Sequence, residues 1–194
     1  MTDDILAPWR ADSSRTLIDS PWLRVRAERC VTARGAVLDP YFLIDYPEWV
    51  HVAAFDEEDR LLLVRQYRHG ARAASLELPG GRMDAHETDP IVAGARELLE
   101  ETGYVAKTLT HLARLSPNPA SHTNGVHVLL GVDARRQAGQ SLDHGEDVTV
   151  EPMPWRDVAR MAARGEIINA QHVGLIFLAL AATKGARFGG KETG

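Results

Sequence analysis

The fold is decided by one stretch, residues 81–104, which reads GRMDAHETDPIVAGARELLEETGY. Its second half predicts a helix from Pro90 to Thr102, because Asp89 suits the N-cap, Pro90 suits the first helical position and Gly103 suits the position after the last turn. Apolar residues recur at helical spacing, so one face should pack on a core; this face carries Ile91, Ala95, Leu98 and Thr102.

The end of this helix is crowded with acids. Glu97 and Glu101 lie one turn apart on the same face, and Glu100 is adjacent. Like charges at this spacing destabilise a helix, and carboxylates near its C-terminus oppose the helix dipole. A lone pattern of this kind is usually a solvated acidic face. The preceding glycine turn, Arg96 and the glycine stop favour a cation site instead, and carboxylate oxygens suit Mg²⁺ or Mn²⁺.

The same stretch resembles the Nudix box, G-x5-E-x7-R-E-U-x-E-E-x-G-U, in which U is a bulky apolar residue. Gly81 and Glu87 match its first fixed positions, and the run from Arg96 to Tyr104 matches the rest. One departure is that eight residues, not seven, separate Glu87 from Arg96. We place the extra residue in the loop before the helix, near Thr88, where it affects the role of Glu87 and leaves the helix in register.

The resemblance implies a metal-dependent hydrolase of diphosphate bonds. It implies that Glu97 and Glu101 are metal ligands, that Glu100 is a ligand or a catalytic support, and that the carbonyl oxygen of Gly80 is a further ligand. Arg96 is expected to orient a glutamate through a bidentate pair. Bound Mg²⁺ or Mn²⁺ would stabilise charge on the diphosphate and activate a water that attacks phosphorus directly.

Over residues 15–183 the chain resembles most the ADP-ribose pyrophosphatases of this family. The runs RQYRHG at 65–70, LELPGG at 76–81 and HGED at 144–147 match their motifs. The resemblance implies that Glu146 is the general base, with Asp143 and Asp147 as alternatives. The expected substrate-binding residues are Arg65, Arg68, Glu77 and Trp49, and Trp22 and Tyr46 are alternatives to Trp49 for stacking on a base.

The remaining sequence predicts an α/β fold, which the resemblance specifies as a Nudix-type α/β/α sandwich with a mixed sheet and an N-terminal antiparallel β extension. A proline-rich loop at 115–124 is expected to form a wall of the substrate pocket. Alternating or apolar patterns predict further strands and helices. The strands are 23–31, 37–44, 49–55, 61–67, 76–78, 109–115, 126–132 and 148–151, and the helices are 155–164 and 171–183.

We divide the chain into three parts. Residues 1–45 form an arm and the β extension, with 1–15 patternless, and by family resemblance this segment pairs subunits into a homodimer. Residues 46–184 form the hydrolase domain. Residues 185–194 are glycine-rich, and we expect them to be a disordered tail.

Composition excludes several classes of protein. The net charge of -5 over 194 residues argues against a nucleic-acid partner. No run of about 18 apolar residues suggests a membrane span, and the acidic start lacks the pattern of a signal peptide. The single cysteine, Cys30, allows no internal disulfide. We therefore expect a cytoplasmic protein.

Three functions remain open. The first is hydrolysis of ADP-ribose to AMP and ribose 5-phosphate. The second keeps the chemistry and changes the substrate to a nucleotide sugar such as GDP-mannose, or to a dinucleotide. The third is a non-catalytic Nudix-like ligand-sensing domain, which the presence of Glu97, Glu100 and Glu101 disfavours.

Overall fold

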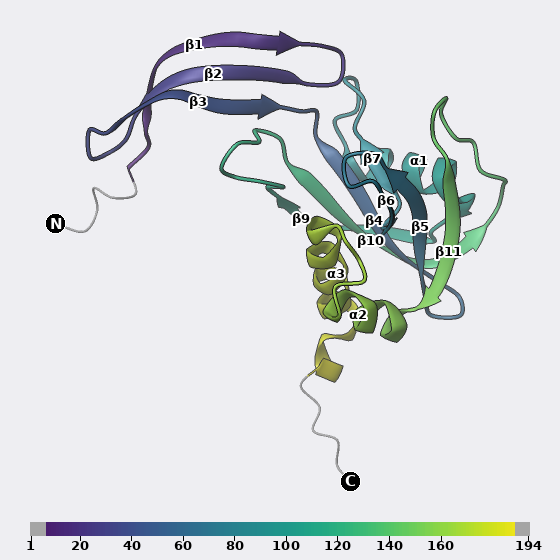
Figure 1. Ribbon diagram of the computed structural model, residues 1–194. Coiled ribbons are helices and arrows are strands. Elements are labelled where there is room, and N and C mark those ends of the chain that lie inside the picture. The colour runs from purple at the N-terminus through teal and green to yellow at the C-terminus, as the bar shows by residue number, and fades with distance from the viewer. Residues whose placement is uncertain (1–6, 189–194) are drawn as a thin grey trace. The chain divides into compact units, whose positions relative to one another are not determined.

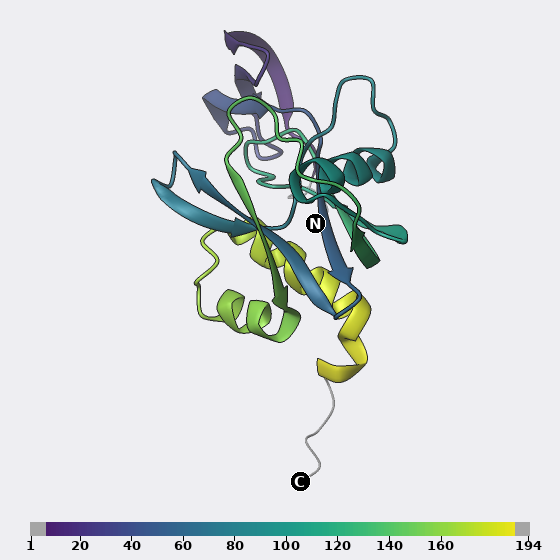
Figure 2. The ribbon, with the colours of Figure 1, turned by 90° about the vertical axis from the view of Figure 1, so that its right-hand side faces the viewer.

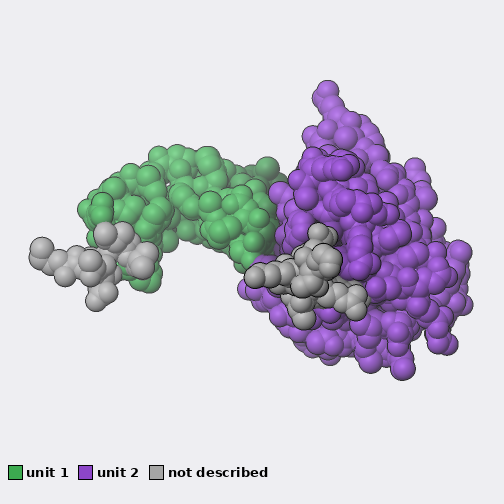
Figure 3. Space-filling view, turned by 90° about the horizontal axis from the view of Figure 1, so that it is seen from below, with its two compact units in different colours: residues 1–48, 116–125 green, residues 49–115, 126–194 purple. Residues whose placement is uncertain are grey.

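The computed structural model describes the backbone of residues 7–188 and the side chains of residues 7–183. The chain divides into two units, coloured separately in Figure 3. The N-terminal unit combines the chain up to Glu48 with the segment Ser116–Gly125, and the main unit contains Trp49–Leu115 and the chain from Val126 onward.

The N-terminal unit contains an antiparallel sheet with the order β1-β2-β3, formed by Arg10–Asp19, Arg24–Val31 and Val37–Asp45. All ten residues of β1 are exposed. The expectation that residues 1–15 have no regular structure is therefore wrong for 10–15, and residues 1–6 lie outside the described residues. Neither face of β1 is buried, so its sequence does not alternate between apolar and polar residues. The sequence therefore gives no pattern that would predict this strand.

The segment 116–125 belongs to the N-terminal unit although it lies between two strands of the main unit. It runs along β3: the amide of Ile44 donates to the carbonyl of Ser121 at 2.8 Å, and the amide of Thr123 donates to the carbonyl of Ile44 at 3.1 Å. The Thr123 hydroxyl also donates to Asp45 Oδ1 at 2.8 Å. Two distant parts of the chain are thus joined within one unit.

The main unit is built on a mixed eight-stranded sheet (Figure 1). Its main path has the order β11-β5-β4-β10-β8, in which β4 and β10 are parallel and the other pairs are antiparallel. Three strands pair beside this path: β6 with β5, β7 with β4, and β9 with β10. The strands are β4 Trp49–Asp56, β5 Arg60–Arg68, β6 Ala73–Glu77, β7 Gly80–Arg82, β8 Tyr104–Val105, β9 Thr108–Leu115, β10 Val126–Arg136 and β11 Val148–Pro154.

Helices cover both faces of this sheet, as Figure 2 shows. One core cluster joins α1, Pro90–Thr102, to one face through Ala93 and Leu98. A second cluster joins α2, Trp155–Ala163, and α3, Ala170–Phe188, to the other face. The expected α/β/α sandwich with a mixed sheet is confirmed.

The helix α1 has the predicted bounds because its end signals are local. The Asp89 carboxylate accepts the amide of Ile91 at 2.8 Å, and Gly103 ends the helix with φ +75°. In its middle, Gly94 allows a close approach to the sheet, since a Cβ there would lie 2.3 Å from Leu129 Cδ1. The lack of a side chain at Gly94 therefore sets how near the acidic helix lies to β4 and β10.

Other bounds differ from the expectations. The short strands β7 and β8 carry too few residues to give a pattern, and β6 begins three residues before the predicted 76–78. The helix α3 continues to Phe188, beyond the predicted end at residue 183, and residues 189–194 lie outside the described residues, so the expected disorder of 185–194 stays a prediction. Within residues 7–188, no helix combines the length and the apolar character needed to span a bilayer.

Candidate active site

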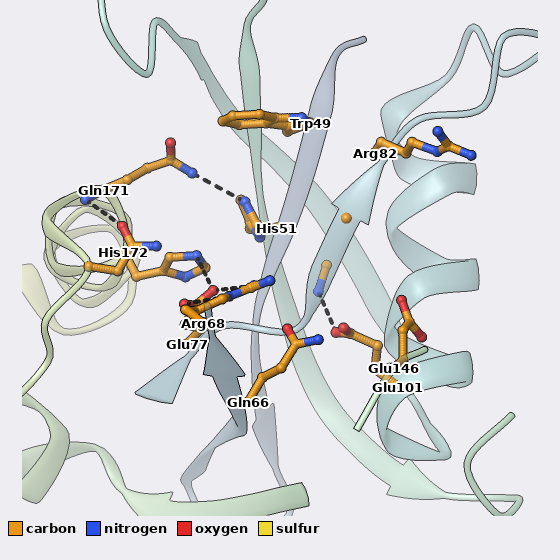
Figure 4. A pocket seen from close by; sticks show the side chains of 13 residues that line it. Trp49, His51, Gln66, Arg68, Glu77, Arg82, Glu101, Glu146, Gln171 and His172 are labelled. Atoms are coloured by element: carbon orange, nitrogen blue, oxygen red, sulfur yellow. Dashed lines mark hydrogen bonds and ion pairs between the residues drawn. The ribbon is translucent and has the colours of Figure 1, made fainter. Parts of the chain in front are cut away.

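The main unit contains a pocket of about 340 Å³ whose lining divides by chemistry (Figure 4). Its acidic side carries Glu101 from α1 and Glu146 from the loop before β11. Two guanidinium groups, Arg68 and Arg82, line it as well. The rest is the indole of Trp49, the backbone at Gly80 and Gly81, and a set of polar side chains, Gln66, His51, Asn169, Gln171 and His172, with Glu77 beside them.

Two buried carboxylates converge on the backbone of Gly80 and Gly81. The amide of Gly80 donates to Glu101 Oε2 at 2.7 Å. A Cβ on Gly81 would lie 2.9 Å from Glu97 Oε1, and a Cβ on Gly80 would lie 2.1 Å from the carbonyl oxygen of Val50. Gly80 also has φ +145°, a conformation that L side chains rarely adopt. Both glycines are thus required for the helix carboxylates to reach this turn.

The two carboxylates are electrostatically strained. Glu97 and Glu101 are only 8% and 6% exposed. Burial raises the pKa of Glu97 to about 7 against the opposing effect of Arg96, and the neighbouring Glu100 and Glu146 raise it further. Burial raises the pKa of Glu101 to about 8, with the Gly80 amide opposing and nearby carboxylates reinforcing. Such a pair is relieved by a bound cation.

Arg96 organises the acids around it. Its Nε and Nη2 donate to the two oxygens of Glu87, both at 2.9 Å, which is the bidentate geometry expected of Arg96. Its Nη1 donates to Glu97 at 3.0 Å and to Glu100 at 2.9 Å. Glu87 also accepts the amide of Asp84 at 2.8 Å, so the loop with the extra residue is closed on itself. The insertion therefore leaves Glu87 beside Arg96.

The donor set fits a divalent metal ion. Carboxylate oxygens on two buried, like-charged side chains are ligands that Mg²⁺ and Mn²⁺ prefer. Among residues 7–183, no three acidic, histidine or cysteine side chains are already gathered as a metal cage. Arg96 Nη1 donates to one oxygen of each of two acids, Glu97 Oε1 and Glu100 Oε2.

Across the pocket, Arg68 is held by a buried acid. Its Nε and Nη2 donate to Glu77 at 3.1 and 2.7 Å. Glu77 is 2% exposed, and His172 Nε2 lies 3.1 Å from its Oε2. Burial alone would raise the pKa of Glu77, but the hydrogen bonds from His172 and Arg68 outweigh it and hold that pKa far below its usual value. Glu77 is therefore a permanent anion beneath Arg68.

The wall formed by β4 and the start of α3 carries the hydrogen-bonding side chains of His51, Gln171 and His172. His51 Nε2 and Gln171 Nε2 are 3.2 Å apart, and the rings of His51 and His172 meet edge to face at 4.5 Å. Burial lowers the pKa of His51 well below its usual value, so its imidazole is neutral at pH 7. This side of the pocket presents neutral hydrogen-bonding groups.

Several expected site residues lie elsewhere. Arg65 does not line this pocket: it points to the other face of β5 from Arg68 and pairs with Glu151 through Nε at 2.5 Å and Nη2 at 2.9 Å. Its expected substrate contact has no support in the structure. Glu100, by contrast, stays with the acids around Arg96 and is half exposed. Trp22, Tyr46 and residues 116–124 of the predicted loop belong to the N-terminal unit, and their expected contacts with the substrate stay predictions.

Sequence reasoning missed the neutral wall. His51 and Gln171 are 120 residues apart and belong to a strand and a helix that only the tertiary fold brings together. One signal was present in the sequence: His172 and Gln171 interrupt the start of an otherwise apolar helix, and buried polar side chains require partners.

Comparison with known proteins gives a consistent result. The model of the NUDIX domain matches residues 46–173, and the model of the nucleoside diphosphate sugar hydrolase N-terminal domain matches residues 9–44. The chain is 33% identical over 174 residues to an ADP-ribose pyrophosphatase of Mycobacterium tuberculosis, covering 89% of this chain and 84% of that protein.

Two further relatives bear on the fold and on the range of substrates. A crystal structure of an ADP compounds hydrolase superposes with a TM-score of 0.79 at 24% identity, covering 94% of this chain and 97% of the other, which shows the shared fold. A CMP-5'-(N-acetyl-N-hydroxy-3-aminopropyl)phosphonate hydrolase of Streptomyces rubellomurinus is 28% identical over 162 residues, covering 84% of this chain and 77% of that protein.

Proposed function

Since the chain belongs to the NUDIX domain family and is a Nudix hydrolase, we propose that it cleaves the diphosphate of ADP-ribose to AMP and ribose 5-phosphate, with Mg²⁺ or Mn²⁺ as cofactor. The observation that carries this proposal is the arrangement of one pocket: Glu101 and Glu146 line it together with the guanidinium of Arg68. Carboxylates for a cation and a guanidinium for phosphate oxygens are what a diphosphate needs for binding.

Each residue has an assigned role. Glu97 and Glu101, with Glu100 and the carbonyl oxygen of Gly80, would hold the metal, and Arg96 positions the glutamates. When bound, the metal would supply charge neutralisation for the diphosphate and would lower the pKa of the attacking water. Glu146 accepts the proton from that water. This residue reaches the pocket from an exposed loop, where its Oε2 accepts the amide of Asp143 at 3.0 Å.

Substrate contacts come from the other side of the pocket. Arg68 binds diphosphate oxygens, and Glu77 contributes by holding Arg68. The indole of Trp49 lines the pocket, where its flat ring, seen nearly edge-on in Figure 4, is suited to stacking on a planar base. ADP-ribose is favoured because the chain is similar over most of its length to an ADP-ribose pyrophosphatase.

A second candidate substrate keeps the same chemistry. The relative from Streptomyces rubellomurinus is named for a CMP-linked phosphonate, and the N-terminal family model is named for nucleoside diphosphate sugars. A nucleotide sugar such as GDP-mannose, or a dinucleotide, is therefore the alternative. A ligand-sensing role without catalysis is disfavoured, since the acids of the box are all present and two of them are buried together.

We further propose a homodimer formed through the N-terminal unit. Large apolar side chains of that unit are exposed, including Ile18 at 52%, Trp22 at 68% and Phe42 at 51%. Contact with a second copy would remove this apolar surface from water. We expect the enzyme to act in the cytoplasm, where its single cysteine, Cys30, stays a free thiol.

The proposal is tested with purified protein, Mg²⁺ and a panel of ADP-ribose, GDP-mannose, NADH and diadenosine polyphosphates, with products separated by chromatography. Glu101→Gln should lose at least about a hundredfold in kcat, as expected when a catalytic metal ligand is removed. Glu57→Gln is the matched control, because Glu57 is exposed and pairs with Arg135 away from the pocket. Faster cleavage of another diphosphate would change the proposed substrate and leave the proposed metal site in place. No cleavage with any divalent ion would favour the sensing role.

A further inference from the structure

One buried histidine connects the start of α3 to the guanidinium that faces the pocket. His172 lies in the first turn of α3 and is 1% exposed. This turn is fixed by Asn169, whose side-chain oxygen accepts the amide of Gln171 at 3.1 Å and whose carbonyl accepts the amide of Val173 at 3.1 Å. The imidazole therefore enters the core from a capped helix end and has little freedom to move.

The hydrogen bonds of His172 fix its tautomer. The amide of Leu78 donates to Nδ1 at 3.0 Å, so Nδ1 must carry a lone pair and the proton must be on Nε2. Nε2 lies 3.1 Å from Glu77 Oε2 and donates to it. Both ring nitrogens are thus used, and the neutral ring is an oriented donor toward the carboxylate.

Glu77, oriented by His172, in turn fixes the orientation of Arg68. Its Oε2 accepts from both His172 and Arg68 Nη2, at 3.1 and 2.7 Å, and its Oε1 accepts Arg68 Nε at 3.1 Å. The arginine pair uses Nε and Nη2, which leaves Nη1 free of Glu77. The side chain of Arg68 is 46% exposed, whereas Glu77 is 2% exposed. The buried Glu77 carboxylate therefore fixes the orientation of the half-exposed Arg68 guanidinium. Figure 4 draws these interactions as dashed lines.

We propose that His172 is a positioning residue that holds Glu77 in the one orientation that aims Arg68 at the diphosphate, so that the start of α3 sets the affinity of the site. The inference rests on the proposed function, because that function assigns the diphosphate to Arg68. If His172 served only to fill the core, substitutions that preserve folding would not change ligand affinity through Arg68.

Two substitutions test the roles of the two ring nitrogens of His172 separately. His172→Asn keeps an acceptor where Nδ1 meets the Leu78 amide and removes the donor to Glu77. His172→Gln places an amide nitrogen near the position of Nε2 and keeps that donor. With a methylene-bridged ADP-ribose analogue as the binding probe, His172→Asn should raise Kd about tenfold. His172→Gln should recover most of this loss. In turnover of ADP-ribose, KM should rise more than kcat falls.

A double-mutant cycle tests whether the effect passes through Arg68. In an Arg68→Ala background, His172→Asn should change Kd by less than about twofold, since the group that it positions is gone. A full tenfold effect in that background would overturn the inference, as would equal Kd values for wild type and His172→Asn. Urea unfolding of each variant identifies any that fail to fold.

Nitrogen NMR of the wild-type imidazole supplies a measurement that needs neither substrate nor variant. His172 should show a protonated Nε2 and an unprotonated Nδ1. A protonated Nδ1 would overturn the inference even if every variant failed to fold. Should the wild type neither bind the analogue nor hydrolyse ADP-ribose, the proposed function fails. The double-mutant cycle is then repeated with the diphosphate that the substrate panel identifies, or with inorganic pyrophosphate and Mg²⁺. The inference stands if His172→Asn raises Kd in the wild-type background and does not in the Arg68→Ala background.

Discussion

Arg65 and Arg68 lie three residues apart on β5 and have the same charge, yet they face different surroundings. Arg68 lines the pocket above Glu77, and Arg65 pairs with Glu151 outside it. We expect Arg68→Ala to lower kcat/KM about 10- to 100-fold, because a charge-assisted contact with phosphate is lost. Arg65→Ala should stay within about threefold, since it removes only a surface ion pair. Steady-state kinetics of both variants measures this, and a comparable loss in the two would contradict the assigned geometry.

The raised pKa values of Glu97 and Glu101 predict how stability depends on pH without metal. In the folded state these pKa values are about 7 and 8, against an ordinary value of 4.5. The folded protein thus holds protons that the unfolded chain has released, so the free energy of unfolding should fall as pH rises from about 5 to 8. Urea unfolding in EDTA measures this slope.

Added Mg²⁺ should reverse the same trend. Metal binding displaces the protons on Glu97 and Glu101, so the stabilisation by Mg²⁺ should grow between pH 6 and 8. The double variant Glu97→Gln, Glu101→Gln is the control, because it has neither titration and should show neither effect. A metal-free stability that is flat or rises over this range would show that the two carboxylates are not crowded as described.

At the scale of elements, two helical glycines differ in what surrounds them. A Cβ on Gly94 of α1 would lie 2.3 Å from Leu129 Cδ1, while a Cβ on Gly174 of α3 would meet nothing within 4 Å. We expect Gly94→Ala to destabilise the protein by about 1–3 kcal/mol through overpacking. Gly174→Ala should stabilise it by about 0.5–1 kcal/mol, because alanine favours the helix. Denaturant unfolding compares them, and a stabilised Gly94→Ala would refute the close contact of helix and sheet.

Elements with local signals were predictable from the sequence, and the others were not. The helix α1 carries its own cap, proline and terminal glycine, so its bounds agree with expectation. The strand β1 is exposed along its whole length and offers no alternation to read. The acidic side of the pocket follows from the box around Glu101. The wall with His51 and His172 depends on β4 and α3 meeting in space, which no local pattern encodes.

For the whole molecule, oligomeric state is the property most open to test. The chain has a mass of 21.3 kDa, so a dimer should give a light-scattering mass of about 43 kDa, twice that value. Replacing exposed apolar residues of the N-terminal unit, as in Ile18→Asp with Phe42→Asp, should shift the protein to the mass of one chain. Glu166→Asp, on the exposed surface of the main unit, is the control. A single-chain mass for the wild type would overturn the dimer.

The pairing of segment 116–125 with β3 also has an evolutionary consequence. Because backbone hydrogen bonds and the Thr123–Asp45 contact join the two, the N-terminal unit is discontinuous in the gene. Recombination that exchanges only residues 1–48 between relatives would separate β3 from the loop that matches it. We expect substitutions at Asp45 and Thr123 to be correlated across relatives, and chimeras that also exchange 116–125 to express better than those that do not.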